Sequence, residues 1–170
     1  MLKLVKPAET DWAKIDEMMA EWTASGEKIV PYSIRVCNYR DREQYLAVFE
    51  AEEQGIPGFV PATTYFCLDT ERDILVGAVN IRHRLNESLL QDGGHIGDGV
   101  RPSERRRGYA TRMIALALEK CREMGIGRVL MTCSRDNIGS AKSIRKNGGV
   151  LENEISSGGE IVQRYWIELG

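Results

Sequence analysis

The chain has 170 residues, of which 42% are hydrophobic and 28% charged, and its formal net charge is −2. This length and composition are typical of one globular domain, here residues 1–170, with enough apolar residues to bury a core. The slightly acidic balance argues against nucleic acid as the main partner, and no apolar run approaches the roughly 20 residues that a membrane span needs.

The first elements along the chain are expected to be a strand and a helix. Residues 2–6 alternate weakly between apolar and polar side chains, and Pro7 ends this strand. Apolar side chains recur at helical spacing from Trp12 to Trp22, which predicts a helix with one buried face. Gly26 follows and is expected to close that helix.

A second helix and a hairpin are expected next. Residues 26–38 read as irregular, and Asp41 is a typical N-cap with Gln44 three residues on, which predicts a helix start. Residues 63–68 and 74–81 are rich in β-branched and apolar side chains and are joined by a polar turn. They predict an antiparallel hairpin.

The second half of the chain is expected to alternate strands and helices. A strand, a long helix and a second strand that is apolar throughout predict a right-handed βαβ crossover, because a strand buried on both faces usually has a parallel neighbour. A shorter helix and two final strands complete the prediction. The expected ranges are 95–101, 108–124, 129–133, 137–147, 149–155 and 160–169.

The cysteines indicate a reducing environment. There are four of them without a Cys-x-x-Cys pair, and three fall in apolar runs. With only two histidines in the chain, this pattern predicts buried free thiols and no metal site. The N-terminus, interrupted by Lys3 and Lys6, has no signal-peptide core. The protein is therefore expected to be cytoplasmic.

The turn at residues 105–110, Arg-Arg-Arg-Gly-Tyr-Ala, carries the strongest functional signal. It lies between an expected strand and a long expected helix, and residues 101–112 hold five arginines against Glu104. The first N–H groups of a helix lack carbonyl partners and carry the positive end of the helix dipole. Gly108 removes a Cβ that would keep an anion away. The arrangement predicts a diphosphate pocket, although neither the P-loop nor the Gly-x-Gly-x-x-Gly pattern is present.

The spacing of this turn is similar to a known signature. Arg105, Gly108 and Ala110 match Arg/Gln-x-x-Gly-x-Gly/Ala, the acyl-CoA pyrophosphate motif of the GNAT superfamily of N-acetyltransferases. The flanking segments resemble a bacterial branch of predicted acetyltransferases whose substrate is undefined. These segments are Arg82-His83, Gly94–Gly97, Val100–Ser103 and Asn147–Gly149.

This resemblance implies an α/β fold and an activity. The fold would be a mixed, six- to seven-stranded central sheet flanked by about four helices, with a splayed parallel strand pair at the cofactor site. The activity would be acetyl-CoA-dependent N-acetylation, by direct attack of a primary amine on the thioester. The acceptor would be a small-molecule or peptide amine, with no nucleic-acid or membrane partner, and a homodimer would follow family habit.

The resemblance also assigns cofactor contacts. Val100 would offer its main chain to the pantetheine arm, and Asn137 would reach a pantetheine amide, although capping a helix is its ordinary role. Ser140 would be a small residue that lets the cofactor approach. The pyrophosphate would lie on the amides of Arg106 through Thr111, within a loop formed by Arg105, Arg106, Arg107, Gly108, Tyr109, Ala110 and Thr111.

One position departs from the family pattern. Many members have a tyrosine seven residues after the asparagine, where it can protonate the departing thiolate. Ile144 stands there in this chain and cannot donate a proton. Either water or another donor would have to serve, with Tyr65, Tyr109 and Tyr165 as the candidate side chains, or the surrounding dipoles alone would help the thiolate to leave.

The general base has three candidates. Asp98 lies two residues before Val100, so that both side chains of a regular strand share one face. His95 titrates near neutrality but points to the opposite face from Asp98, and His83 is the third candidate. The alternative is structural: Asp98 would pair with an arginine, and the histidines would hold loops by hydrogen bonds.

Two other readings remain open. The loss of the tyrosine at position 144 favours a catalytically silent acyl-CoA-binding or sensing module. The arginine cluster could instead belong to a nucleic-acid-binding domain, although no basic face with interleaved aromatic residues is visible. Turnover measured beside simple cofactor binding separates the first of these from an enzyme.

Overall fold

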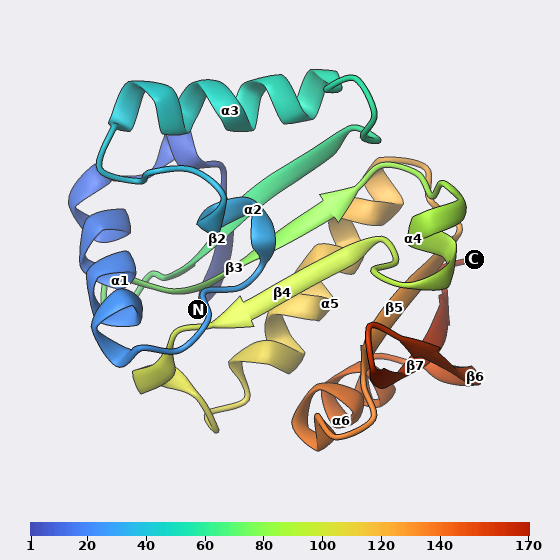
Figure 1. The fold of residues 1–170 in the computed structure, drawn as a ribbon. Helices are drawn as coiled ribbons and strands as arrows, with labels where there is room; N and C mark the ends of the chain where they lie inside the picture. The colour runs from blue at the N-terminus through green and yellow to red at the C-terminus, as the bar shows by residue number, and fades with distance from the viewer.

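A four-stranded sheet with helices on both faces dominates the computed structural model, which describes residues 1–170 (Figure 1). The strands are β1 (Leu2–Val5), β2 (Ala62–Asp69), β3 (Ile74–Arg82), β4 (Ile96–Val100), β5 (Arg128–Ser134), β6 (Val150–Ser157) and β7 (Glu160–Glu168). The helices are α1 (Trp12–Ser25), α2 (Tyr32–Arg35), α3 (Arg42–Gln54), α4 (Glu87–Gln91), α5 (Tyr109–Glu123) and α6 (Ile138–Lys146). Single 3-10 turns occupy Pro7–Glu9 and Pro102–Glu104. No helix is both long and apolar enough to cross a bilayer.

The seven strands are divided between two antiparallel sheets, ordered β1-β2-β3-β4 and β5-β7-β6. The predicted mixed α/β class and the 63–81 hairpin are confirmed, but the central sheet is not continuous. Its two parts are joined where His95 N donates to Leu130 O at 2.8 Å and Leu130 N donates to His95 Nδ1 at 3.0 Å. Strand β4 is therefore an edge strand beyond this point.

Two apolar clusters hold the layers together. One lies between the sheets and α5, and the other lies between the first sheet and helices α1 and α3. In the second cluster the ring of Tyr45 packs edge-on against Trp12 and Phe49, with centroid distances of 5.7 and 4.7 Å. The Tyr45 hydroxyl donates to Ile34 O at 2.8 Å. These contacts seat α3 and α2 on the same face of the sheet.

Most local predictions are confirmed, and two short helices were missed. Gly26 adopts φ 75° at the end of α1, and Asp41 Oδ1 accepts from Gln44 N at 3.1 Å at the start of α3. Helix α2 lies within residues 26–38, which were expected to be irregular, and α4 lies between the predicted hairpin and the predicted 95–101 strand, where no element was expected. Each is shorter than two turns, so neither leaves a periodic apolar pattern in the sequence.

Arg101 ties α1 to the end of β4 and gives the first testable prediction. It is 3% exposed, and its guanidinium donates to Glu17 and Glu21 at 2.6–2.7 Å and to Leu75 O at 3.0 Å. Arg101→Ala is expected to lower the free energy of unfolding by about 2 kcal/mol, because the buried guanidinium loses its bonds to Leu75 O and to two partly exposed carboxylates. Urea denaturation measures this loss.

The exposed pair of Arg128 and Glu168 is the control, with an N–O distance of 2.7 Å and both side chains more than half exposed. Arg128→Ala should cost less than about 1 kcal/mol. Equal losses for the two variants would show that Arg101 is not a structural anchor.

Candidate functional site

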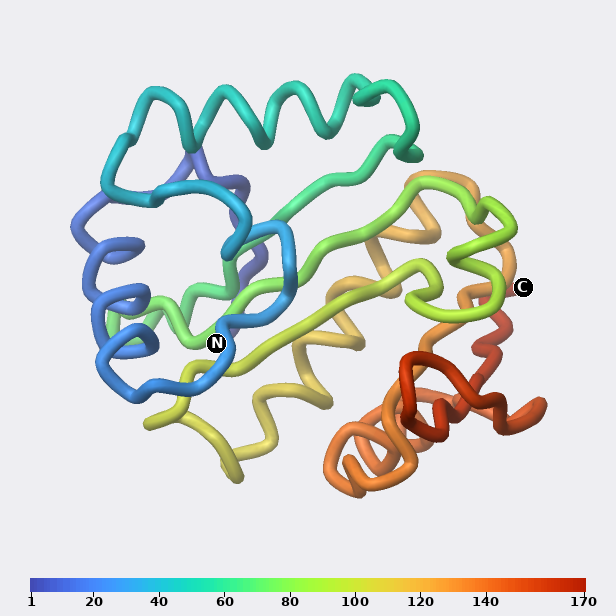
Figure 2. Tube along the Cα trace, in the orientation of Figure 1, coloured from blue at the N-terminus to red at the C-terminus, as the bar shows by residue number.

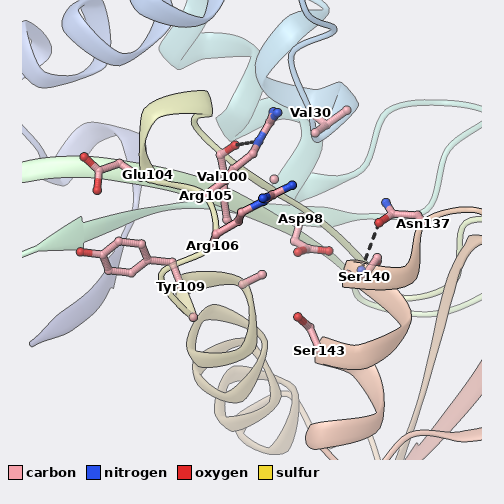
Figure 3. A pocket seen from close by; sticks show the side chains of 14 residues that line it. Val30, Asp98, Val100, Glu104, Arg105, Arg106, Tyr109, Asn137, Ser140 and Ser143 are labelled. Carbon is pink, nitrogen blue, oxygen red and sulfur yellow. Dashed lines mark hydrogen bonds between the residues drawn. The ribbon is translucent and has the colours of Figure 1, made fainter.

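A cavity of about 600 Å³ opens where β4, the turn before α5 and the start of α6 meet (Figure 3). Its volume is in the range of small-molecule sites. Most of the residues predicted for the cofactor site line it, whereas Arg107 and Thr111 do not, and of the predicted catalytic pair Asp98 lines it and His95 does not. The lining residues are Val30, Asp98, Gly99, Val100, Glu104, Arg105, Arg106, Gly108, Tyr109, Ala110, Asn137, Gly139, Ser140 and Ser143.

The N-terminus of α5 is open toward this cavity. The backbone N–H groups of residues 105–111 donate no hydrogen bond within the protein, and the first one that does is Arg112 N, to Gly108 O. No side chain caps α5, whereas aspartate or asparagine side chains cap α1, α3, α4 and α6. The run of free donors at a dipole's positive end is suited to an anion with several acceptor oxygens.

Two left-handed residues shape this turn. Gly108, the N-cap, has φ 78° and ψ 9°, and Arg106 has φ 63°. Arginine rarely adopts such a φ, and a β-branched side chain at Gly108 would be strained. A Cβ at Gly108 would meet no atom of the protein. The positive φ is therefore the reason that the fold itself gives for glycine, in addition to the room for an anion that was predicted.

A buried network anchors both ends of the turn. Arg72 forms two bonds with Glu104, at 3.1 and 2.6 Å, and also donates to the hydroxyl of Tyr109 at 2.6 Å. That hydroxyl donates to Asp69 Oδ2 at 2.9 Å. Burial opposes ionisation of Asp69, but the hydrogen bonds from Arg72 and Tyr109 outweigh it and lower its pKa to about 2. The phenol of Tyr109 is thus turned away from the cavity (Figure 3).

The three consecutive arginines have different environments. Arg105 is paired with Glu27 at 2.8 Å and donates through Nε to Val100 O at 3.2 Å. Arg107 lies 3.7 Å from Glu104. Arg106 has no partner in the protein, is exposed and lines the cavity. Of the three, only Arg106 offers an uncommitted charge to a ligand there.

Helix α6 forms the opposite wall. Asn137 Oδ1 accepts from Ser140 N at 3.1 Å, which confirms the helix-capping alternative, and its side-chain amide remains free. Ser143 is bonded to Thr111 Oγ1 at 3.1 Å, so α6 is tied to α5. Ile144 is fully buried in the core and does not line the cavity.

None of the tyrosines proposed as proton donors offers a free hydroxyl to the cavity. Tyr109 is bonded as described, Tyr165 donates to Gln163 Oε1 at 2.8 Å, and neither Tyr165 nor Tyr65 lines the cavity. The hydroxyls on the α6 wall belong to Ser140 and Ser143. Ser140 had been singled out only for its small size.

Asp98 is the base candidate that lines the cavity, and it points toward α6 (Figure 3). It has no hydrogen-bonding or ionic partner, so the arginine pair of the structural alternative is absent, and burial raises its pKa to about 6. Because residues 97, 99 and 101 bond to β3, the N–H groups of Asp98 and Val100 point to the open edge of the sheet.

The histidines have structural partners. His95 is buried outside the cavity, where burial and the nearby Arg82 lower its pKa to about 4 and its Nδ1 accepts from Leu130 N. His83 Nε2 lies 2.8 Å from Thr63 Oγ1. These contacts match the structural alternative, and the geometry brings neither ring to Asp98 or to the open helix end.

The comparisons with known proteins agree with this arrangement. A family model described as an acetyltransferase (GNAT) domain matches residues 2–150. No curated protein matches the sequence significantly. Among solved structures, a ribosomal-protein-S5-alanine acetyltransferase from Vibrio fischeri is similar with a TM-score of 0.70 and 15% identity, over 98% of this chain and 91% of that one.

Two further solved structures have the same fold. A ribosomal L7/L12 alpha-N-protein acetyltransferase in complex with coenzyme A gives a TM-score of 0.66 and 17% identity, over 98% and 93% of the two chains. A spermidine/spermine N-acetyltransferase from Vibrio cholerae gives 0.62 and 14%, over 99% and 93%. At these identities the likeness concerns the fold.

Proposed function

This chain belongs to the GNAT family of acetyltransferases, and from that premise we propose that it transfers the acetyl group of acetyl-CoA to a primary amine. The observation that carries the proposal is the uncapped N-terminus of α5, where the N–H groups of residues 105–111 are free beside the cavity. A diphosphate accepts hydrogen bonds from such groups, and the helix dipole favours its charge.

The cofactor contacts are divided among the cavity walls. The amides of residues 106–111 hold the diphosphate, and Arg106 adds a positive charge. The edge of β4 at Val100 pairs with the pantetheine arm, which Asn137 and Ser140 border from α6. Acetyl-CoA supplies the acetyl group as a thioester, which an amine can attack directly.

Asp98 is the proposed base. An alkylamine must lose a proton before it attacks a carbonyl carbon, and a carboxylate whose pKa is raised to about 6 by burial is suited to accept it. The new N–C bond forms as the C–S bond breaks. The amine nitrogen then loses its second proton, and the departing sulfur gains one through water or through the Ser140 hydroxyl. The free N–H groups on the edge of β4 donate to the thioester oxygen.

The setting of the reaction is also part of the proposal. The acceptor is a small-molecule or peptide amine, in line with the ribosomal-protein and polyamine acceptors named for the structural neighbours. Four free cysteines support a reducing, cytoplasmic location. A homodimer remains an expectation from the family.

Two measurements test the proposal together. Calorimetry with acetyl-CoA should detect binding, and release of free coenzyme A should depend on an added amine from a panel of polyamines, amino acids, aminoglycosides and peptides. Mass spectrometry identifies the acetylated product. Binding without turnover on any amine would favour a silent acyl-CoA-binding module, and absence of binding would contradict both.

The unequal environments of the arginines give a second prediction. Arg106→Ala should weaken coenzyme A binding about tenfold, because it removes the unpaired charge that lines the cavity. Arg107→Ala, at an exposed position outside the lining, should weaken binding less than about threefold. Calorimetry at low and high salt measures both, and the Arg106 effect should shrink with salt. Equal effects would contradict the assignment.

A further inference from the structure

A second cavity, of about 520 Å³, lies on the other face of the sheet, between α2, α3 and the segment before β2. Large apolar side chains border it and are unusually exposed, among them Phe59 at 73% and Tyr32 at 58%. Ile56 and Val36 belong to the same border. Exposed apolar residues gathered around a concave site favour a ligand with an apolar body.

The floor of this cavity is polar and carries a carboxylate. Glu52 Oε1 accepts from Thr64 Oγ1 at 3.2 Å and from Asn80 Nδ2 at 3.1 Å, and Thr64 is bonded to Ser33 Oγ at 2.9 Å. Ser33, Thr64 and Asn80 are buried. Glu52 Oε2 has no partner in the protein. Burial raises the pKa of Glu52, against the hydrogen bonds from Thr64 and Asn80 and the charge of Arg82.

A cation lines the same cavity without pairing with Glu52. Arg82 donates only through Nη1, to Gly93 O at 3.0 Å and Gly94 O at 3.1 Å, and no ion pair joins it to Glu52. Burial lowers the pKa of Arg82, while Glu52 and Asp92 raise it. The fully buried side-chain nitrogen and oxygen atoms that lack a hydrogen-bond partner belong to Trp22 and Arg101. The unpartnered atoms of Glu52 and Arg82 are therefore not fully buried, and both residues line the cavity.

The second cavity adjoins the first across β4. Asn80, which bonds to Glu52, is the strand partner of Gly97. A Cβ at Gly97 would lie 3.4 Å from the Pro31 side chain and 3.9 Å from Arg82 Nη2. Pro31 lines the second cavity and Val30 the first, and Figure 2 shows the segment after α1 running beside β4. The Val30–Pro31 segment therefore packs against β4 between the two cavities.

We propose that the second cavity binds a free α-amino acid with an apolar side chain. The ammonium group lies on Glu52, the carboxylate on Arg82, and the side chain against the apolar border. Two opposite charges that are partly desolvated and unpaired are each satisfied by a zwitterion, whereas a polyamine would bring a second positive charge toward Arg82. The site is separate from the proposed acetyl transfer, whose base Asp98 lines the first cavity.

Three ligands of similar size test the contributions of the ammonium and carboxylate groups separately. L-leucine carries both groups, L-leucinamide only the ammonium, and 4-methylpentanoate only the carboxylate. Calorimetry with the full chain saturated with coenzyme A should give an affinity for leucine at least about tenfold above that of either analogue, since each loses one charge-assisted contact. Tighter binding of spermidine, or equal binding of leucine and leucinamide, would overturn the proposal. The second result would indicate a peptide N-terminus.

A variant pair on α3 tests the ammonium contact. Glu52→Gln keeps the acceptor for Thr64 and Asn80 but removes the charge, so leucine binding should fall about tenfold and approach that of 4-methylpentanoate. Glu50→Gln, exposed on the same helix, should leave both affinities unchanged. Unchanged leucine binding in the Glu52 variant would refute the contact.

The results for coenzyme A and for the amino acid can be read separately. Coenzyme A binding is measured first, and Glu52→Gln should leave it intact because Glu52 is outside the first cavity. If coenzyme A does not bind but leucine does, the pocket assignment holds and the acetyl-transfer proposal fails. If coenzyme A binds and leucine does not, the pocket assignment fails alone.

Discussion

Replacing Gly108 with valine is expected to weaken coenzyme A binding at least about thirtyfold, or about 2 kcal/mol. Gly108 has φ 78° at the start of α5, and a β-branched residue is strongly disfavoured in that conformation. To relieve the strain, the turn would rotate, and the free N–H groups of residues 105–111 would no longer converge. Calorimetry with coenzyme A measures the loss.

Gly125, at the other end of α5, supplies the matched control. It has φ 80°, and a Cβ there would meet no protein atom, so Gly125→Val introduces a similar backbone strain far from the cavity. Both variants should lose comparable free energy of unfolding, yet only the Gly108 variant should lose affinity. If the Gly125 variant loses as much affinity, the effect is general destabilisation rather than damage to the turn.

Asp98→Asn is expected to lower kcat by at least about a hundredfold, the usual contribution of a general base. With burial raising the pKa of Asp98 to about 6, the rate of the natural protein should rise with pH through that value. The rise should be absent in the variant, apart from the contribution of the substrate amine. Coenzyme A affinity should be retained, because the diphosphate contacts are elsewhere. A variant with the same kcat and pH profile would exclude Asp98 as the base.

The same substitution should make the protein more stable at high pH. The pKa of Asp98 is higher in the folded state than its unfolded value of about 4, so the folded state binds more protons between about pH 4 and about pH 6. The free energy of unfolding therefore falls as the pH rises through that window, and the whole loss is reached above about pH 6. Asp98→Asn should recover on the order of 2 kcal/mol at about pH 8 and little at about pH 4. Asp16→Asn, exposed on α1, should change neither.

Local chemistry explains which features could be predicted from the sequence. Helix caps such as Asp41 and Asn137 act within three residues, and the turn at 105–110 combines strand, glycine and helix signals within a short span. The resemblance to the family supplied the prediction of the cofactor and of the overall order of elements. The division into two sheets could not be read in this way, because it depends on how far β4 and β5 pair, which no local pattern specifies.

Long-range partners account for what was missed. Arg72 and Glu104, which anchor the turn, are far apart in sequence, and Arg72 looked like an ordinary hairpin residue. The separate environments of Arg105, Arg106 and Arg107 depend on Glu27 and Glu104. Glu52 was one of many acidic residues in a helix with a solvated face, and what distinguishes it is the hydrogen bond that it accepts from Asn80.

The short backbone contact between the two sheets, at His95 and Leu130, has a consequence for the protein in a cell. A cofactor arm lying along the edge of β4 would bridge the two sheets. At a free concentration about a hundred times its dissociation constant, it would add about 2.7 kcal/mol to the stability of the fold. When acetyl-CoA is scarce, proteases should cleave the chain faster, so that the abundance of the protein would follow the concentration of acetyl-CoA.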